Sequence, residues 1–232
     1  MNHLKTVNIV IIAAVLALAG FTVYSLLPKS TDEPADPQAT LLEFKILKTD
    51  LEQWEIDQYV KEFAEVKAAL ENDPENSQAL LQLGQLKQYA GDYAGAEAAW
   101  IRAGEVRPRN STSFGNLAGL YVNFMHAYAK AEAAYRVAIA NSQGEEKNAY
   151  FYRNFYSLYQ DHLKDDQKAE ATLLQGIADN PKSSDLHILL GIFYRERGQP
   201  DQAILHYEQG IALSPVENRA AEQELAELKR QR

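Results

Sequence analysis

The chain of 232 residues is 46% hydrophobic and 24% charged, which is typical of a protein that folds. It contains no cysteine, so disulfides, thiolate metal sites and catalytic thiols are excluded. Thirteen acidic and four basic residues between Ser30 and Glu75 account for the whole net charge of −9. Because no basic surface is predicted, we do not expect nucleic acid as a partner.

An uncharged apolar run occupies residues 7–27, after a short tail at residues 1–6. As a helix it would be roughly 31 Å long, close to the roughly 30 Å hydrocarbon thickness of a bilayer. The run therefore predicts one N-terminal transmembrane helix that anchors the chain. The alternative is a cleaved signal peptide, because Ala17-Leu18-Ala19 fits the cleavage pattern, but the apolar stretch continues from Phe21 to Leu27 and argues against it.

The short tail, with Lys5 and the terminal amine, favours an orientation in which the tail is cytoplasmic. The prediction is a single-pass protein of a bacterial inner membrane, with its body on the periplasmic side. Residues 28–38 are rich in proline and acidic residues, which predicts an extended linker between the membrane and the body.

Residues 39–76 are predicted to form an N-terminal helical capping segment. The apolar side chains that recur there at amphipathic spacing are Leu51, Trp54, Val60, Phe63, Val66 and Leu70. Within this segment the fold of residues 39–48 stays open. Leu42, Phe44 and Ile46 alternate as in a strand, whereas the flanking helices favour a helix.

Residues 77–217 contain a pattern that recurs at residues 77–110, 111–145, 150–183 and 184–217. In each unit an alanine is followed four residues later by a bulky side chain and three further on by a small one. A large and small pair precedes the alanine, and proline closes three units. Small residues at these places would let two helices approach closely. The defining positions are Gly84, Ala96, Trp100, Ala103, Pro108, Ala118, Ala131, Tyr135, Ala138, Ser157, Ala169, Leu173, Gly176, Pro181, Gly191, Ala203, Tyr207, Gly210 and Pro215.

The spacings within each unit are helical, and a glycine followed by an acidic residue separates two helices, as at Gly91-Asp92. This pattern resembles the tetratricopeptide repeat, whose period is 34 residues. The resemblance implies an all-α fold, a solenoid of four helix-turn-helix repeats with flanking capping helices, the last at residues 218–232. The second repeat departs from the pattern by one extra residue near Met125 and by the lack of a closing proline.

The titratable residues show no catalytic or metal-binding motif. His187 and His206 lie on opposite helices of the last repeat and could meet, but for isolated histidines we expect a packing role. We therefore predict that the protein is not an enzyme and has no metal site, no cofactor and no small-molecule substrate. A pocket that united the two histidines with carboxylates would favour the enzymatic alternative.

In proteins that this pattern resembles, the first helix of each repeat lines a concave groove that binds a peptide or a partner helix. The corresponding residues here are Leu81, Gln85, Tyr89, Gly115, Gly119, Asn123, Phe151, Asn154, Leu158, Ile188, Ile192 and Arg195. For Phe151 and Ile188 the alternative is packing against neighbouring units. Relatives that bind chaperones clamp a terminal carboxylate with lysines and asparagines. Such residues are missing at the corresponding places in the first two repeats, so the groove is predicted to be neutral.

These features together predict a membrane-anchored scaffold or adaptor for protein partners in the assembly or maturation of envelope complexes. The layout is similar to that of accessory proteins of cytochrome c maturation, although layout alone does not define a function. The alternatives are a structural subunit that associates with itself and a non-catalytic subunit of a membrane enzyme complex.

Overall fold

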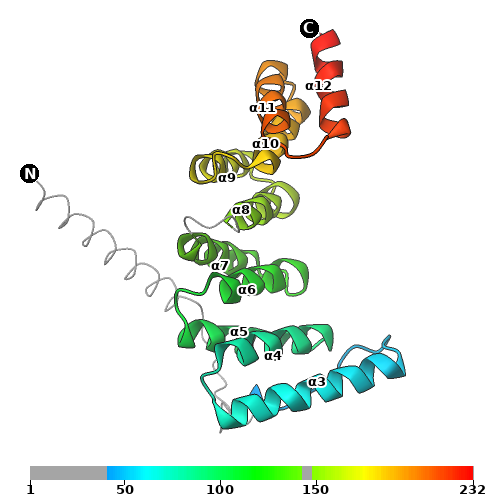
Figure 1. Ribbon diagram of the computed structural model, residues 1–232, viewed down its shortest axis with the longest axis vertical. Helices are drawn as coiled ribbons and strands as arrows, with labels where there is room; N and C mark the ends of the chain where they lie inside the picture. The colour runs from blue at the N-terminus through cyan, green and yellow to red at the C-terminus, as the bar shows by residue number, and fades with distance from the viewer. Residues whose placement is uncertain (1–40, 143–147, 232) are drawn as a thin grey trace, which may run out of the picture. The chain divides into compact units, whose positions relative to one another are not determined.

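The computed structural model describes residues 41–142 and 148–231, and each regular element in these two ranges is a helix (Figure 1). This confirms the prediction of an all-α solenoid of paired helices. The chain forms two compact units, divided in the sequence between Asn141 and Ser142. The first unit contains α3 (Gln53–Asn72), α4 (Ser77–Tyr89), α5 (Tyr93–Val106), α6 (Ser111–Asn123) and α7 (Tyr128–Asn141). The second contains α8 (Asn148–Ser157), η1 (Leu158–Leu163), α9 (Asp166–Asp179), α10 (Ser184–Glu196), α11 (Pro200–Leu213) and α12 (Arg219–Gln231).

The predicted tail, transmembrane anchor and linker, residues 1–38, lie outside the described residues. Within the part of the chain that the structure describes, no helix combines the length and the apolar composition needed to cross a membrane. The anchor at residues 7–27 therefore stays a prediction.

Short polar residues between the helices fix where several of them begin. The side chains of Asn76 and Asp92 accept hydrogen bonds from backbone N–H groups in the first turns of α4 and α5. Asp165 and Ser183 do the same for α9 and α10. Such a cap typically stabilises a helix by about 1 kcal/mol, because it satisfies an N–H group that has no partner within the helix.

The turn inside each repeat contains one residue in the left-handed conformation. This residue is Gly91 (φ 82°) in the first repeat and Gly198 (φ 68°) in the last. In the two middle repeats it is His126 (φ 51°) and Lys164 (φ 53°), where a side chain makes the conformation about 1–2 kcal/mol less favourable. The two middle repeats thus have the same left-handed turn conformation as the first and last, although they lack the glycine that indicates it in the sequence.

The two middle repeats also enlarge their turns. In the second repeat, the N–H of Ala127 donates to the carbonyl of Tyr121 at 2.9 Å across the turn that holds the extra residue near Met125. In the third repeat, α8 passes into the π-helical turn η1, and the N–H of Asp165 donates to the carbonyl of Tyr159 at 3.0 Å. The π-helical turn was not predicted, because the apolar residues continue through it at spacings that also fit an α-helix.

Residues 43–48 have no regular secondary structure, so they form neither the helix that their neighbours favour nor a strand. The ring of Phe44 stacks on that of Phe63 in α3, with centroids 4.5 Å apart. The N–H groups of Leu47 and Lys48 both donate to the carbonyl of Ala90, at 2.7 and 3.0 Å. The segment therefore joins α3 to the turn between α4 and α5.

A buried lysine holds the same segment in place. The ammonium of Lys87 donates to the backbone carbonyl of Glu43 and pairs with the carboxylate of Asp92 at 3.0 Å. The other oxygen of that carboxylate caps α5 at the N–H of Gly95. Because a buried charge is costly unless it is paired and hydrogen-bonded, these contacts explain how a lysine is accommodated in the core.

Large side chains lie over glycines where the paired helices meet. A Cβ atom on Gly84 of α4 would stand 2.3 Å from Nε1 of Trp100 in α5. A Cβ on Gly191 of α10 would stand 3.1 Å from the ring of Tyr207 in α11. The indole of Trp100 is held in this place, because its Nε1 donates to the carbonyl of Leu81 at 3.0 Å.

A glutamate and a tyrosine join successive repeats in both units. In the first unit, the hydroxyl of Tyr121 in α6 donates to Glu97 in α5 at 2.7 Å, and Lys130 also reaches this carboxylate at 2.9 Å. In the second unit, Tyr194 in α10 donates to Glu170 in α9 at 2.6 Å. The same bond thus recurs between the second helix of one repeat and the first helix of the next.

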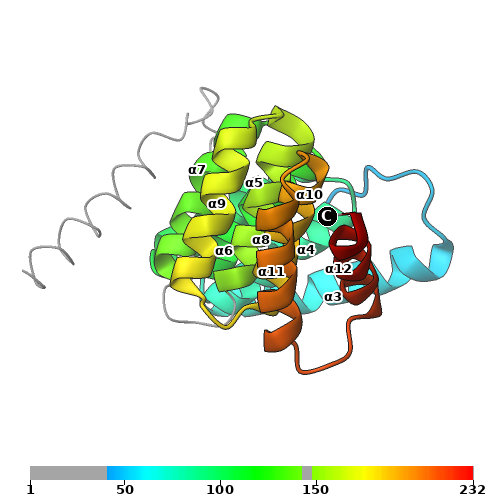
Figure 2. The same ribbon diagram turned by 90° about the horizontal axis from the view of Figure 1, so that it is seen from above.

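The C-terminal helix α12 covers the end of the second unit. In Figures 1 and 2 it lies beside α10 and α11, after a loop that follows α11. Two ion pairs fix it, Arg195 to Glu224 at 2.6 Å and Lys229 to Glu208 at 2.6 Å. On its inner side, Ala221 is buried.

The contact between Gly84 and Trp100 predicts a large effect of one methyl group. Gly84→Ala should lower the free energy of unfolding by about 1–3 kcal/mol, because the added Cβ overlaps an indole that cannot move without losing its hydrogen bond. The control is Gly119→Ala in α6, where nothing lies within 4 Å of the added Cβ and helix propensity favours alanine by up to about 1 kcal/mol. Urea denaturation measures both changes. Equal stability of the two variants would contradict this account of the glycine.

Candidate peptide-binding cleft

The structure places the predicted groove residues in different environments. Gln85, Tyr89 and Asn123 are exposed, and the positions that are half-buried are Leu81, Gly115, Gly119, Asn154, Ile188, Ile192 and Arg195. Leu158 is 0% exposed, so the prediction that it lines an open groove was wrong, and Phe151, at 6%, fits its packing alternative. The short helix α8 buries two neighbouring stripes, which include Phe151, and Leu158 begins the π-helical turn, which changes the direction of the following side chains.

In the second unit, internal contacts also occupy two of the remaining predicted positions. The side chain of Ile188 packs on Gly210 of the same repeat, with Cδ1 2.6 Å from the place of a Cβ. The guanidinium of Arg195 pairs with Glu224 of α12. The packing alternative for Ile188 therefore fits the structure better than an open groove does.

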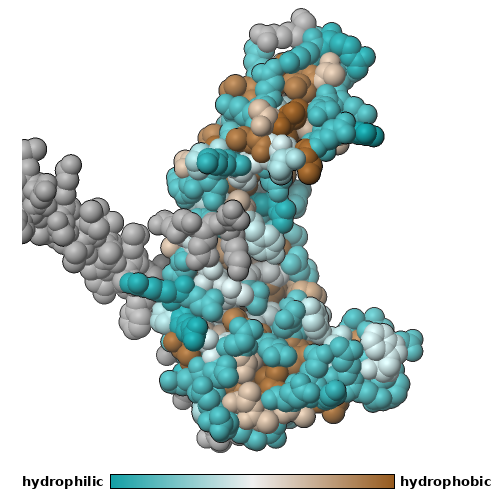
Figure 3. All heavy atoms as spheres, viewed as in Figure 1, coloured by the Kyte–Doolittle hydropathy of each residue, from teal (hydrophilic) through white to brown (hydrophobic). Residues whose placement is uncertain are grey.

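In the first unit, α3 and α4 enclose a cleft with a volume of about 360 Å³. It contains two of the predicted groove residues, Gln85 and Tyr89. The residues that line it are Trp54, Glu55, Gln58, Tyr59, Glu62, Gln82, Gln85, Leu86 and Tyr89. Figure 1 shows that α3 extends beyond the ends of α4 and α5 in this view. In Figure 3 the surface of this projecting end is mostly hydrophilic, with a pale group of intermediate hydropathy among strongly hydrophilic residues.

Three aromatic rings form the walls of this cleft. Trp54 is 66% exposed and Tyr89 is 47% exposed, whereas Tyr59 is half-buried. The rings of Tyr59 and Tyr89 are nearly parallel, at 24°, with centroids 6.3 Å apart. The amide of Gln85 donates to the hydroxyl of Tyr89 at 2.8 Å and so orients that ring.

Polar side chains of α3 complete the cleft. Glu55 accepts a hydrogen bond from the backbone N–H of Glu52 at 2.8 Å and belongs to the capping box that starts α3. Glu62 accepts from the amide of Gln58 at 2.8 Å. Both carboxylates thus take part in local contacts of the helix, and each is left without a cation partner among the described residues.

The sequence pattern did not identify Trp54 as a surface residue. It assigned Trp54 and Val60 to the apolar stripe of the capping helix, but only the later part of that stripe, from Phe63, enters the core with α4. Val60 is 50% exposed, like Trp54. A usable signal was the composition of the first half of α3, where the aromatic residues Trp54 and Tyr59 stand among polar and acidic residues.

The two histidines of the last repeat do meet. Their Nδ1 atoms are 3.3 Å apart, and the ring of Tyr194 stacks on that of His206. Burial lowers the pKa of His187, and burial together with the charge of His187 lowers the pKa of His206. No carboxylate contacts the pair directly, and no cluster of three potential metal ligands occurs in the described ranges.

The comparisons with known proteins agree with this architecture. Residues 172–205 match the sequence profile of the tetratricopeptide repeat, and one similar solved structure, TTC0263 of Thermus thermophilus, is described as a protein of this repeat. The fold is that of the tetratricopeptide repeat. Among curated proteins, none matches the chain.

Three solved structures are examples of proteins whose fold is similar to that of this chain. PilW, a type IV pilus biogenesis factor, has a TM-score of 0.53 and 18% identity, over 77% of this chain and 86% of PilW. MamA has a TM-score of 0.52 and 20% identity, over 64% and 84% of the two chains. PilF of Pseudomonas aeruginosa has a TM-score of 0.51 and 24% identity, over 67% and 68%. At these identities the likeness concerns the fold alone.

The histidine pair of the last tetratricopeptide repeat predicts a pH-dependent stability. Because the pKa of each histidine is lower in the folded chain than in the unfolded chain, the unfolded chain binds more protons as the pH falls. The stabilisation is present above about pH 6.5 and is lost as the pH falls through the folded-state values. We expect the midpoint of thermal unfolding to decrease between pH 7.5 and 5. The decrease should be smaller in His187→Gln/His206→Gln, and an equal decrease in both proteins would contradict the assignment.

Proposed function

We propose that this chain is a protein-interaction scaffold that binds a peptide segment of a partner in the cleft between α3 and α4. Tetratricopeptide-repeat proteins generally mediate contacts between proteins, which supports the general part of this proposal. The observation that carries the specific part is the exposure of Trp54 and Tyr89 beside a cleft of about 360 Å³.

Exposed aromatic side chains that gather in one cleft are typical of binding surfaces. Tryptophan and tyrosine dominate the energetics of interfaces, because each offers a large contact area with few rotatable bonds. Gln58, Gln82 and Gln85 supply amide groups at the same place, which suits hydrogen bonds with a peptide backbone. The cleft is too small for a partner helix but has room for one or two side chains of an extended segment.

The N-terminal segment supports a place for this scaffold at a membrane. The apolar run at residues 7–27 is long enough to span a bilayer, and the acidic and proline-rich residues 28–38 suit a spacer. With the tail in the cytoplasm, the repeats work on the periplasmic side of a bacterial inner membrane. PilW, one of the similar structures, is described as a type IV pilus biogenesis factor, and we propose a setting of the same kind, the assembly of envelope complexes.

Site-specific photo-crosslinking tests the cleft in the cell. With Gln58→p-benzoylphenylalanine in the full-length chain, we expect a discrete crosslinked partner that is reduced at least tenfold when Trp54→Ala and Tyr89→Ala are added. The matched control is Val60→Ala, which removes an exposed apolar side chain of the same helix outside the cleft and should leave the crosslink unchanged. Circular dichroism verifies that each variant folds. A crosslink that survives the loss of both aromatic rings would show that the partner does not use the cleft.

The absence of cysteine allows a direct test of the anchor and its orientation. We introduce Ala226→Cys on the exposed side of α12 and treat cells with a permeabilised outer membrane with a maleimide that cannot cross the inner membrane. Labelling is expected while the inner membrane is intact, and the protein should resist carbonate extraction unless residues 7–27 are deleted. Labelling only after lysis, or release by carbonate, would contradict the proposed orientation or the anchor.

A further inference from the structure

We propose that the α3–α4 cleft recognises a positively charged segment of its partner and seats one arginine side chain between the aromatic rings and the carboxylates. This inference rests on the proposed function and names the chemistry of the ligand. The residues that carry it are Trp54, Tyr59, Tyr89, Glu55 and Glu62.

The charge of the cleft selects a cation. Its lining contains the carboxylates of Glu55 and Glu62 and no basic side chain. The acidic residues of α3 as a whole outnumber its lysines, and the chain between Ser30 and Glu75 holds the entire net negative charge. A basic segment is therefore attracted on approach, and an acidic segment or an anionic lipid surface is repelled.

The carboxylates can accept such a ligand without losing an ion pair. Glu55 uses one oxygen for the capping box of α3, and Glu62 uses one oxygen for the amide of Gln58. Each carboxylate therefore keeps its second oxygen available for a donor, since a carboxylate has about four acceptor positions. Glu55 and Glu62 are seven residues apart, two helical turns on the same face of α3, so a guanidinium in the cleft has a carboxylate with a free oxygen at either end.

The rings favour arginine over lysine. A guanidinium is planar and weakly hydrated, so it stacks on an aromatic ring while its edge remains free for hydrogen bonds. The exposed indole of Trp54 is the best such surface in the cleft, and the nearly parallel rings of Tyr59 and Tyr89 offer flat walls. An ammonium group is a strongly hydrated point charge and gains less from the same surfaces.

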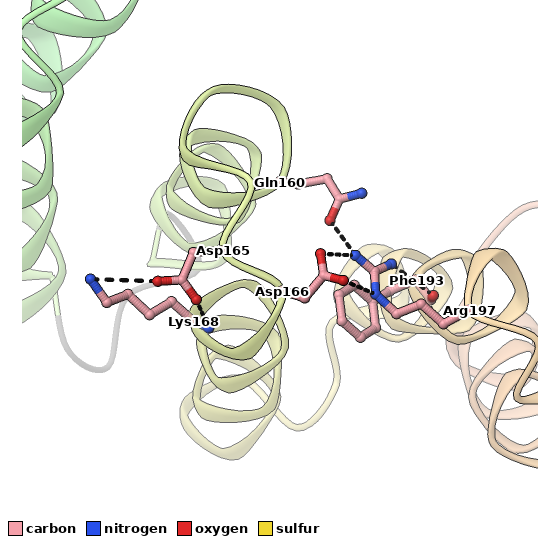
Figure 4. A network of polar contacts seen from close by, with 6 residues as sticks. All are labelled: Gln160, Asp165, Asp166, Lys168, Phe193 and Arg197. Carbon is pink, nitrogen blue, oxygen red and sulfur yellow. Dashed lines mark hydrogen bonds and ion pairs between the residues drawn. The ribbon is translucent and has the colours of Figure 1, made fainter.

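The chain already holds one arginine by this chemistry in its second unit (Figure 4). The guanidinium of Arg197 lies 3.5 Å from the ring centroid of Phe193. Its N–H groups donate to the carboxylate of Asp166, including one bond of 3.0 Å, and to the amide oxygen of Gln160 at 2.9 Å. An aromatic face, a carboxylate and a glutamine amide thus fix an arginine there, and the α3–α4 cleft presents the same three groups with no arginine of its own in the lining.

The volume sets the size of the ligand. About 360 Å³ accommodates one guanidinium with its alkyl stem and a neighbouring apolar group near Leu86, but not a folded element. The amides of Gln82 and Gln85 lie at the same surface and suit the backbone on either side of the arginine. We therefore expect an extended segment in which arginine stands next to an apolar residue.

Three peptides that differ in one side chain test the inference with the full-length protein in detergent. The probes are fluorescein-labelled Gly-Ser-Leu-Xaa-Leu-Ser-Gly with arginine, lysine or citrulline as Xaa. Their binding is measured by fluorescence polarisation as the protein concentration is raised to 1 mM. We expect the arginine peptide to bind at least tenfold more tightly than the citrulline peptide, which has the same shape without the charge, and several-fold more tightly than the lysine peptide. Its Kd should rise with the concentration of NaCl.

Two variants assign the binding to the cleft. Glu62→Gln should weaken the arginine peptide at least fivefold, whereas Glu65→Gln, which removes an exposed charge of α3 outside the cleft, should have little effect. Tyr89→Leu should weaken both charged peptides. Equal binding of the citrulline peptide, equal binding of the lysine peptide, or equal effects of the two glutamate variants would each overturn the inference.

The proposed function and this inference can fail separately. A crosslink from Gln58 that depends on Trp54, together with no binding of the arginine peptide, would leave the scaffold function intact and overturn the assignment of arginine. Absence of both the crosslink and the peptide binding would overturn the proposed function as well as the inference. If Trp54→Ala converts an oligomer into a monomer by light scattering, a second copy of this chain occupies the cleft, and the inference is also overturned.

Discussion

The rest of the structure depends on the close approach of paired helices, in which a large side chain of one helix lies over a glycine of the other. At Gly84 even a methyl group would overlap Trp100, and Gly191 and Tyr207 make the equivalent contact in the second unit. Because Trp100 is also hydrogen-bonded to the carbonyl of Leu81, the distance between α4 and α5 is fixed within one repeat. Each repeat therefore forms its own pair, and the array grows by contacts between neighbours, such as that of Glu170 with Tyr194.

The same packing decides where the chain leaves a binding surface. Within the second unit internal contacts occupy predicted groove positions, so Phe151 is buried and Arg195 is paired with Glu224. The capping helix α3 belongs to no complete repeat and packs on α4 along the part that begins at Phe63. Among the described residues no further helix covers the first half of α3, and Trp54 remains at the surface beside the cleft. The place of the proposed binding cleft thus follows from the way α3 packs on α4.

The sequence predicts the features that are local and periodic. Pairs such as Gly84 and Trp100 recur from repeat to repeat, as at Gly191 and Tyr207, so the helices and their pairing could be predicted without a structure. Features that depend on distant or irregular contacts could not. Lys87 is buried because Glu43, far away in the sequence, supplies a carbonyl, and Lys164 takes the left-handed place of a glycine. Periodicity also shows which face of a helix is apolar but not what covers it, which explains the wrong prediction for Leu158.

The distribution of charge relates the proposed anchor to the proposed ligand. All of the net negative charge lies between Ser30 and Glu75, and the screening length at physiological ionic strength is about 8 Å. The charge therefore acts close to the cleft rather than over the whole protein. Anionic headgroups repel such a segment, which favours a cleft that faces the aqueous phase. The negative charge attracts any basic segment to α3. The aromatic rings then favour a guanidinium over other cations, which acidic residues alone would not distinguish.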